Sequence, residues 1–157
     1  MNETSNPEVP PSSVAIISTL DSIDDPEGEA SLATLQSTLA ALEQAPDADR
    51  CIGALFAIFE RFPWSDGFES FWSILHALER LPGSERALVA SVRRAPGEFN
   101  LLMVKRCLNG GITEVDGVSL LPLLQEVVAS PAYSERARRE AERFAMIHLE
   151  EIAPSSG

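Results

Sequence analysis

The chain has 157 residues, of which 45% are hydrophobic and 23% charged, a composition typical of one globular domain rather than of a disordered or membrane-spanning protein. Its net charge is −12, and the whole excess lies in residues 1–79, where 14 acids face two bases, Arg50 and Arg61. Because phosphate binding needs clustered lysine and arginine, this distribution excludes nucleic acid as the expected partner. It favours a basic protein partner, or else an acidic surface that only keeps the protein in solution.

The two ends of the chain are predicted to be flexible. Residues 1–13 combine Pro7, Pro10 and Pro11 with polar residues, and residues 153–157 form a short polar end, so residues 14–152 are expected to make a single helical domain with an acidic N-terminal part. The first base follows the first apolar run, which argues against a secretory signal, and that run is too short to span a bilayer. Cys51 and Cys107 lie in apolar helical patterns and are expected to be free thiols, which favours a cytoplasmic location without membrane contact.

The first half of the domain is predicted to contain helices and an acidic loop. Residues 14–20, VAIISTL, fit either a short helix or a strand, and the acidic loop DSIDDPEGE follows at 21–29. Apolar residues at three- and four-residue steps then predict helices over 29–44 and 47–62, and Pro63 ends the second of them.

The stretch after Pro63 holds both tryptophans. Ser65 or Asp66 is expected to cap a new helix, and apolar spacing predicts that its buried side consists of Phe68, Phe71, Trp72, Leu75 and Leu78. With Phe56 and Phe59 of the preceding helix, these aromatic residues predict the seam of an antiparallel helix hairpin. Trp64 lies in the turn, where it either covers the end of the hairpin or stands out beside Asp66 as a binding anchor.

Four more helices are predicted, over residues 84–95, 98–109, 117–130 and 132–152. Hairpins beginning near residues 29, 66 and 97 recur at the scale of helical repeats, so we expect an all-α fold built as an irregular HEAT-like stack of helix hairpins, with a compact helical bundle as the alternative. We expect more than about 60% helix, well above the usual helical share of globular proteins, and no sheet of more than two short strands. The predicted core consists of Leu55, Phe56, Phe59, Phe71, Trp72, Leu75, Phe99, Leu102, Met103, Leu124 and Phe144.

The sequence contains no pattern typical of a catalytic or metal site. His76 and His148 lie on or beside the apolar sides of different helices, without the spacing of a zinc motif, and are expected to be core or boundary residues. Asp24 and Asp25 are adjacent in a loop, which suits a solvated acidic run better than acid–base chemistry. We therefore expect no enzymatic activity, no metal and no cofactor.

The segments LFAIFERFPWSDGFESFWSILHALE (55–79) and LVASVRRAPGEFNLLMVKRCLNGG (88–111) resemble a group of small, acidic, all-helical immunity proteins encoded beside bacterial polymorphic toxins of the Rhs and contact-dependent type. The resemblance covers residues 50–150 and is one of overall pattern. It implies a cytosolic bacterial protein that binds one cognate toxin domain, as a monomer in a one-to-one complex, and blocks the toxin's active site or substrate groove. It implies no catalytic residues.

The candidate partner-binding residues follow from charge and aromatic character, because complementary charge speeds association and buried aromatic anchors slow dissociation. A first group consists of Asp21, Asp24, Asp25, Glu27, Glu29, Trp64, Asp66 and Glu69, and a second, in RRAPGEFN, of Arg93, Arg94, Glu98 and Asn100. The second group has a structural alternative, in which Pro96 and Gly97 make a turn while Glu98 and Asn100 satisfy helix ends. The competing function is a cytosolic secretion chaperone or adaptor for an exported effector, which would be expected to dimerise.

Overall fold

The computed structural model describes residues 12–154, is 71% helical and confirms the all-α class. Most of the predicted N-terminal tail and the last three residues of the predicted C-terminal end lie outside the described residues. The helices are α1 (Ser13–Asp21), α2 (Glu29–Gln44), α3 (Ile52–Arg61), α4 (Ser70–Arg80), α5 (Ser84–Arg94), α6 (Glu98–Asn109), α7 (Leu120–Ala129) and α8 (Glu135–Ile152). A 3₁₀ turn, η1 (Ala48–Cys51), precedes α3, and two short strands, β1 (Glu114–Val115) and β2 (Val118–Ser119), precede α7.

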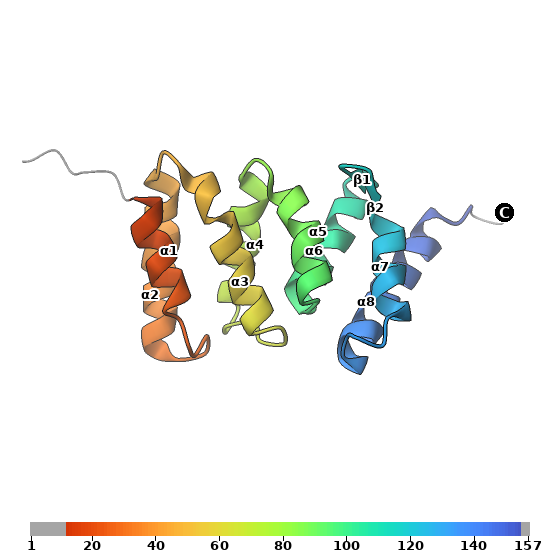
Figure 1. The fold of residues 1–157 in the computed structure, drawn as a ribbon, viewed down its shortest axis with the longest axis horizontal. Helices are drawn as coiled ribbons and strands as arrows, with labels where there is room; N and C mark the ends of the chain where they lie inside the picture. The colour runs from red at the N-terminus through yellow and green to blue at the C-terminus, as the bar shows by residue number, and fades with distance from the viewer. Residues whose placement is uncertain (1–11, 155–157) are drawn as a thin grey trace, which may run out of the picture.

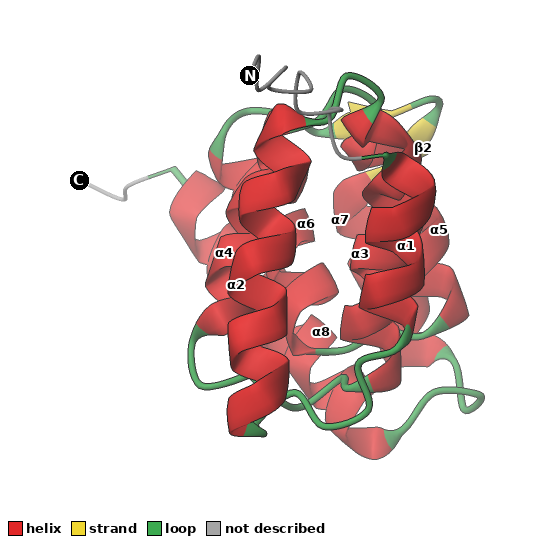
Figure 2. Ribbon diagram, turned by 90° about the vertical axis from the view of Figure 1, so that its left-hand side faces the viewer, coloured by secondary structure: helices red, strands yellow, loops and turns green. Residues whose placement is uncertain are grey.

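The helices form four antiparallel pairs that stand side by side in a row, α1–α2, α3–α4, α5–α6 and α7–α8 (Figure 1). The odd-numbered helices form one layer and the even-numbered helices the other, and all helices of one layer run in the same direction (Figures 1 and 2). Of the two architectures expected, the structure is therefore the stack of helix hairpins and not the compact bundle.

Residues 14–20 decide where the pairs begin. They form a helix, and the hydroxyl of Ser12 caps it by accepting a hydrogen bond from the backbone N–H of Ala15 at 3.2 Å. The predicted starts of the hairpins near residues 29, 66 and 97 are consequently wrong, because α2 is the second member of the first pair.

The predicted start of α4 is also wrong. The hydroxyl of Ser65 accepts from the N–H of Gly67, and the carboxylate of Asp66 accepts from the N–H of Phe68, both at 3.0 Å. These side chains therefore close local turns rather than capping a helix at residues 65–66, and α4 begins only at Ser70.

The short strands form a hairpin around Asp116 and Gly117, whose φ angles of 47° and 80° are those of a tight two-residue turn. The sequence predicts a helix over 117–130 in which Pro122 lies in the first turn after a Ser119 cap or at the first position. Aspartate followed by glycine accepts the left-handed conformation of this turn readily, so α7 begins three residues later, at Leu120.

A continuous core runs through the whole stack, from Ile16 in α1 to Ala145 in α8. Most of the predicted core residues are buried, but Leu102 is only half-buried, and Trp72 retains 39% of its accessible surface. Phe68, predicted to belong to the same apolar side, is 64% exposed because it lies before α4 rather than in it.

Candidate partner-binding surface

All four connections within the helix pairs lie at the same edge of the stack, the lower edge in Figure 1. The Arg61 guanidinium joins the first two, because Nη2 donates to the backbone oxygens of Leu20 at 3.0 Å and Ile23 at 3.4 Å. The N–H of Glu98 donates to the oxygen of Pro63 at 2.8 Å, which joins the second connection to the third. Gly97 makes this approach possible, since a Cβ there would lie 2.7 Å from Cβ of Pro63.

This arrangement brings the two predicted acidic clusters to one edge. The seven carboxylates, which we call the acidic edge, are all exposed: Asp21, Asp24, Asp25, Glu27 and Glu29 from the α1–α2 connection and the start of α2, and Asp66 and Glu69 from the α3–α4 connection. The sequence alone left open whether the two clusters share a face. Because α1–α2 and α3–α4 are neighbours in the stack, their lower loops are neighbours too.

Trp64 lies at the same edge but is half-buried. The guanidinium carbon of Arg136, from the start of α8, lies 4.4 Å from the centre of its ring, a distance typical of a cation–π contact. One face of the indole is therefore covered by the protein itself, which supports the alternative that Trp64 covers the end of the hairpin.

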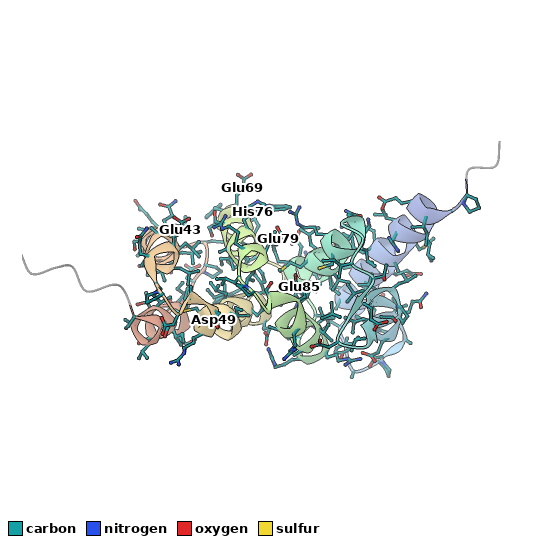
Figure 3. The ribbon with its side chains drawn as sticks, turned by 90° about the horizontal axis from the view of Figure 1, so that it is seen from above. Glu43, Asp49, Glu69, His76, Glu79 and Glu85 are labelled. Carbon is teal, nitrogen blue, oxygen red and sulfur yellow. The ribbon has the colours of Figure 1, made fainter. Side chains whose placement is uncertain are left out.

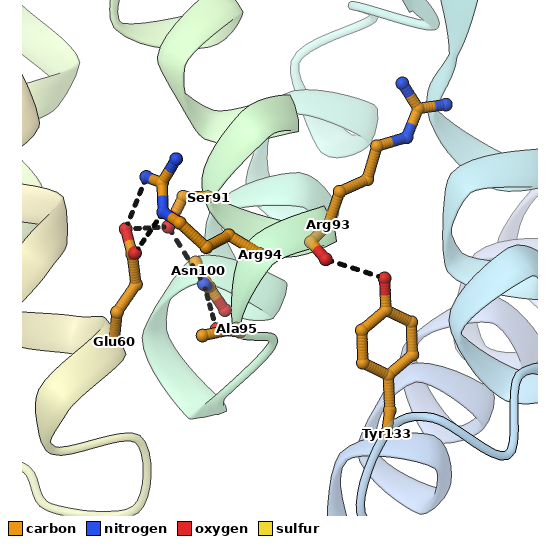
Figure 4. Close-up of polar contacts among 7 residues, drawn as sticks. All are labelled: Glu60, Ser91, Arg93, Arg94, Ala95, Asn100 and Tyr133. Atoms are coloured by element: carbon orange, nitrogen blue, oxygen red, sulfur yellow. Dashed lines mark hydrogen bonds and ion pairs between the residues drawn. The ribbon is translucent and has the colours of Figure 1, made fainter.

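The second predicted group is mostly used within the fold (Figure 4). The amide of Asn100 is fully buried, accepts from the N–H of Gly97 at 2.7 Å and donates to the oxygen of Ala95 at 2.9 Å and to the hydroxyl of Ser91 at 3.1 Å. Asn100 was therefore wrongly assigned to the partner surface, and it serves the helix-end role given as the alternative.

The two arginines of this group are exposed but have acidic neighbours in the fold. Arg94 makes a two-point ion pair with Glu60 of α3 at 2.5 and 2.8 Å, and Arg93 pairs with Glu126 of α7 at 3.1 Å. The backbone oxygen of Arg93 also accepts from the hydroxyl of Tyr133 at 2.7 Å (Figure 4). These contacts link α5 to the helix pairs on either side of it.

Glu98, at the start of α6, is half-buried. Burial raises the pKa of its carboxyl above the ordinary value, and the nearby carboxylates of Glu140 and Asp66 add to the rise, while Arg136 and Arg143 oppose it. The charged form of Glu98 is thus disfavoured where it stands.

The turn Gly67–Phe68–Glu69 also belongs to this surface, although the apolar spacing predicts that Phe68 is buried. Its three residues have φ angles of 56°, 48° and 71°, so two side-chain-bearing residues adopt the left-handed conformation in succession. The turn exposes Phe68 between two carboxylates of the acidic edge, Asp66 and Glu69. The signal in the sequence was Ser-Asp-Gly ahead of Phe68, since each of these residues favours a turn over a helix.

A groove between α2 and α4 was missed as well. It has a volume of about 410 Å³ and opens on the outer side of the layer formed by the even-numbered helices. Glu43 of α2 and His76 of α4 line it, and both project from this layer together with Glu69 (Figure 3). The groove results from the side-by-side stacking of two helices that are not adjacent in sequence, so no local pattern predicts it.

The two histidines, His76 and His148, lie in different environments and do not interact with each other. His76 lies beside Trp72, with ring centres 6.2 Å apart and the rings tilted by 34°, and its Nδ1 lies 3.5 Å from the Glu79 carboxylate, whereas His148 is buried in α8. Within residues 12–154, no three His, Cys, Asp or Glu side chains are grouped in a way that would hold a metal ion. The structure also contains, over the same residues, no helix with the length and apolarity needed to cross a membrane.

No family model, curated protein or solved structure matches this chain.

Proposed function

We propose that this protein is an immunity protein, which binds a basic bacterial toxin domain through its acidic edge and covers the toxin's active site or substrate groove. The observation that carries the proposal is the assembly of seven exposed carboxylates, from two separate connections and the helix ends beside them, on one edge of the helical stack. A field of one sign on one face attracts a partner of opposite charge and raises the association rate.

The hydrogen bonds that hold the loops of the acidic edge in place support a binding role. The first two helix pairs contain three bases, Arg50, Arg61 and Arg80. Arg61 donates to the backbone oxygens of Leu20 and Ile23 and so holds the α1–α2 loop in place. A loop that the fold already holds in one conformation loses less conformational entropy when a partner binds. The secretion chaperone named as the alternative has no observation in its favour among the described residues.

The test uses the domain encoded at the C-terminal end of the gene immediately upstream. We expect the purified protein and that domain to form a one-to-one complex, measured by light scattering after size exclusion, and we expect co-expression to protect cells that the domain alone kills. Loss of protection should follow loss of binding across a set of acidic-edge variants. A protein that neither binds that domain nor protects cells against it is not an immunity protein for it.

A further inference from the structure

The α2–α4 groove has an apolar floor and a polar rim. Leu35, Leu39 and Ala77 form the floor, and Glu43 and Arg80, which form an ion pair at 3.7 Å, lie at its upper end. A volume of about 410 Å³ is large enough for several side chains of a partner segment. Six of the ten residues that line it are polar or charged, so the groove offers both apolar contacts and hydrogen-bonding groups.

The charges around the groove are arranged asymmetrically along it. Because α2 and α4 run parallel, their first residues lie at the same lower end, where Glu29 begins α2 and Glu69 precedes α4 (Figure 1). Both carboxylates belong to the acidic edge. At the upper end, Glu43 and Arg80 cancel each other in charge. Two carboxylates therefore lie beyond its lower end, the charges at its upper end cancel, and an apolar floor with a polar rim lies between them.

We propose that the α2–α4 groove binds an amphipathic segment of a basic partner protein, with apolar side chains on Leu35, Leu39 and Ala77 and with lysine or arginine directed toward Glu29 and Glu69. The inference rests on the proposed function for the basic character of the partner. It adds that this partner binds in the groove and that the groove recognises apolar and basic side chains. A second copy of this chain is a poor occupant, since two chains of net charge −12 repel each other.

The experiment selects peptides from a random 16-residue phage-displayed library on the full-length protein and on three variants of it. Ala40→Trp and Ser73→Trp fill the groove from opposite walls, at exposed helix positions that line it. Ser37→Trp is the matched control, because Ser37 is also exposed on α2 but lines the hollow that faces α1. Circular dichroism and thermal melting check that each variant is folded.

We expect the wild type and Ser37→Trp to enrich peptides that combine leucine, isoleucine or phenylalanine with lysine or arginine, and both filled variants to lose them. A synthetic peptide from the enriched set should bind the wild type at least about tenfold more tightly than Ala40→Trp, a difference of one decade in Kd. Glu29→Gln with Glu69→Gln should weaken the same peptide and reduce the dependence of its Kd on salt.

The proposal is overturned if no peptide is enriched, if the enriched peptides lack basic residues, or if they bind the filled variants as tightly as the wild type. It is also overturned if sedimentation shows a wild-type dimer that Ala40→Trp dissociates, since the occupant would then be a second copy. The upstream-encoded domain separates the two proposals. If the upstream-encoded domain binds both tryptophan variants as tightly as the wild type, the groove proposal alone is refuted. If basic peptides bind the protein but that domain does not, the immunity function alone is refuted.

Discussion

Phe68 combines an exposed aromatic side chain with an unfavourable backbone conformation. Its side chain is 64% exposed, and its φ of 48° lies in the left-handed region, which is unfavourable for a residue with a bulky side chain. An exposed aromatic side chain in a strained turn gains little from folding. Its position between Asp66 and Glu69 makes it a candidate contact for the proposed partner.

The first prediction follows from this strain. Replacing Phe68 by glycine should leave the free energy of unfolding unchanged or raise it by up to about 1 kcal/mol, because glycine adopts positive φ without steric cost. The same variant should bind the partner domain more weakly. Urea unfolding and calorimetric titration measure the two effects, and a loss of stability above about 1 kcal/mol would show that Phe68 is a packing residue.

Glu98 provides a prediction about pH. Its pKa in the folded protein is raised above the ordinary value of 4.5, mainly by burial, so its neutral form is the one that folding favours. The stability that this group contributes is fully present below about 4.5 and is lost as the pH rises through the raised pKa. Glu98→Gln should therefore become more stable relative to the wild type as the pH rises from 4 to 7, measured by denaturant unfolding at each pH.

Glu79 is the control for this experiment, because its pKa is shifted in the opposite direction. Two hydrogen bonds from Arg106, each 2.9 Å, lower the pKa of its carboxyl below 4.5. Its contribution is present above the ordinary pKa and is lost as the pH falls through the lowered one. Glu79→Gln should thus be less stable than the wild type at pH 7 and should approach it in acid. Parallel pH profiles for the two variants would contradict both assignments.

At the scale of the element, α4 separates core from surface in two adjacent residues. Phe71 is fully buried and lies 5.5 Å from Phe59 and 5.7 Å from Phe99 between ring centres. Trp72 also contacts Phe99, at 5.5 Å, yet it remains 39% exposed. The helix turns by about 100° per residue, so neighbouring aromatic residues cannot both face the core centre.

The two residues form a matched pair for mutation. Phe71→Ala should lower the free energy of unfolding by about 3–5 kcal/mol, as expected for a large core aromatic residue. Trp72→Ala should lower it by about 1–2 kcal/mol, because it loses one edge-to-face aromatic contact and only part of a buried surface. Chemical denaturation of both variants tests this difference. Equal losses would mean that Trp72 belongs to the core as the apolar spacing alone suggests.

At the scale of the whole molecule, the stack converts a charge excess in the sequence into a directional field. The charge of −12 arises from residues 1–79, and the described part of this range, residues 12–79, lies in the first two helix pairs and their connections. Stacking places the lower loops of these pairs beside each other, whereas in the following pairs Arg93, Arg94 and Arg106 form ion pairs with acids of neighbouring helices. The acidic edge therefore lies at one half of the molecule.

Neutralising three of its residues tests the role of this field. Asp24→Asn, Asp25→Asn and Glu27→Gln together should slow association with the upstream-encoded domain by about threefold to tenfold at low salt and reduce the salt dependence of the rate. The melting temperature should change little, because the three residues are exposed in a loop. Stopped-flow kinetics gives the rates.

The matched control removes the same charge elsewhere. Glu114→Gln, Glu142→Gln and Glu150→Gln change three exposed acids of the β1–β2 hairpin and of α8. This variant should associate nearly as fast as the wild type. Equal slowing by the two triple variants would mean that net charge, and not the acidic edge, governs the encounter.

The sequence by itself determined the helices. Apolar residues at three- and four-residue steps, together with Pro63 and Pro96, marked most helices to within a few residues, since these signals act between neighbours along the chain. It also marked the acidic residues and the absence of any recognisable catalytic motif. It failed at Phe68, where the side chains of Ser65 and Asp66 close turns that compete with the helix.

Only the tertiary structure decided which of these residues share a surface. The two acidic loops are separated in sequence by α2, η1 and α3, and the walls of the α2–α4 groove belong to helices of different pairs. Their proximity depends on how parallel helices pack side by side, which is set by the fit of whole buried faces rather than by any local spacing. The same packing buried Asn100, left Trp72 half-exposed and covered one face of Trp64 with Arg136.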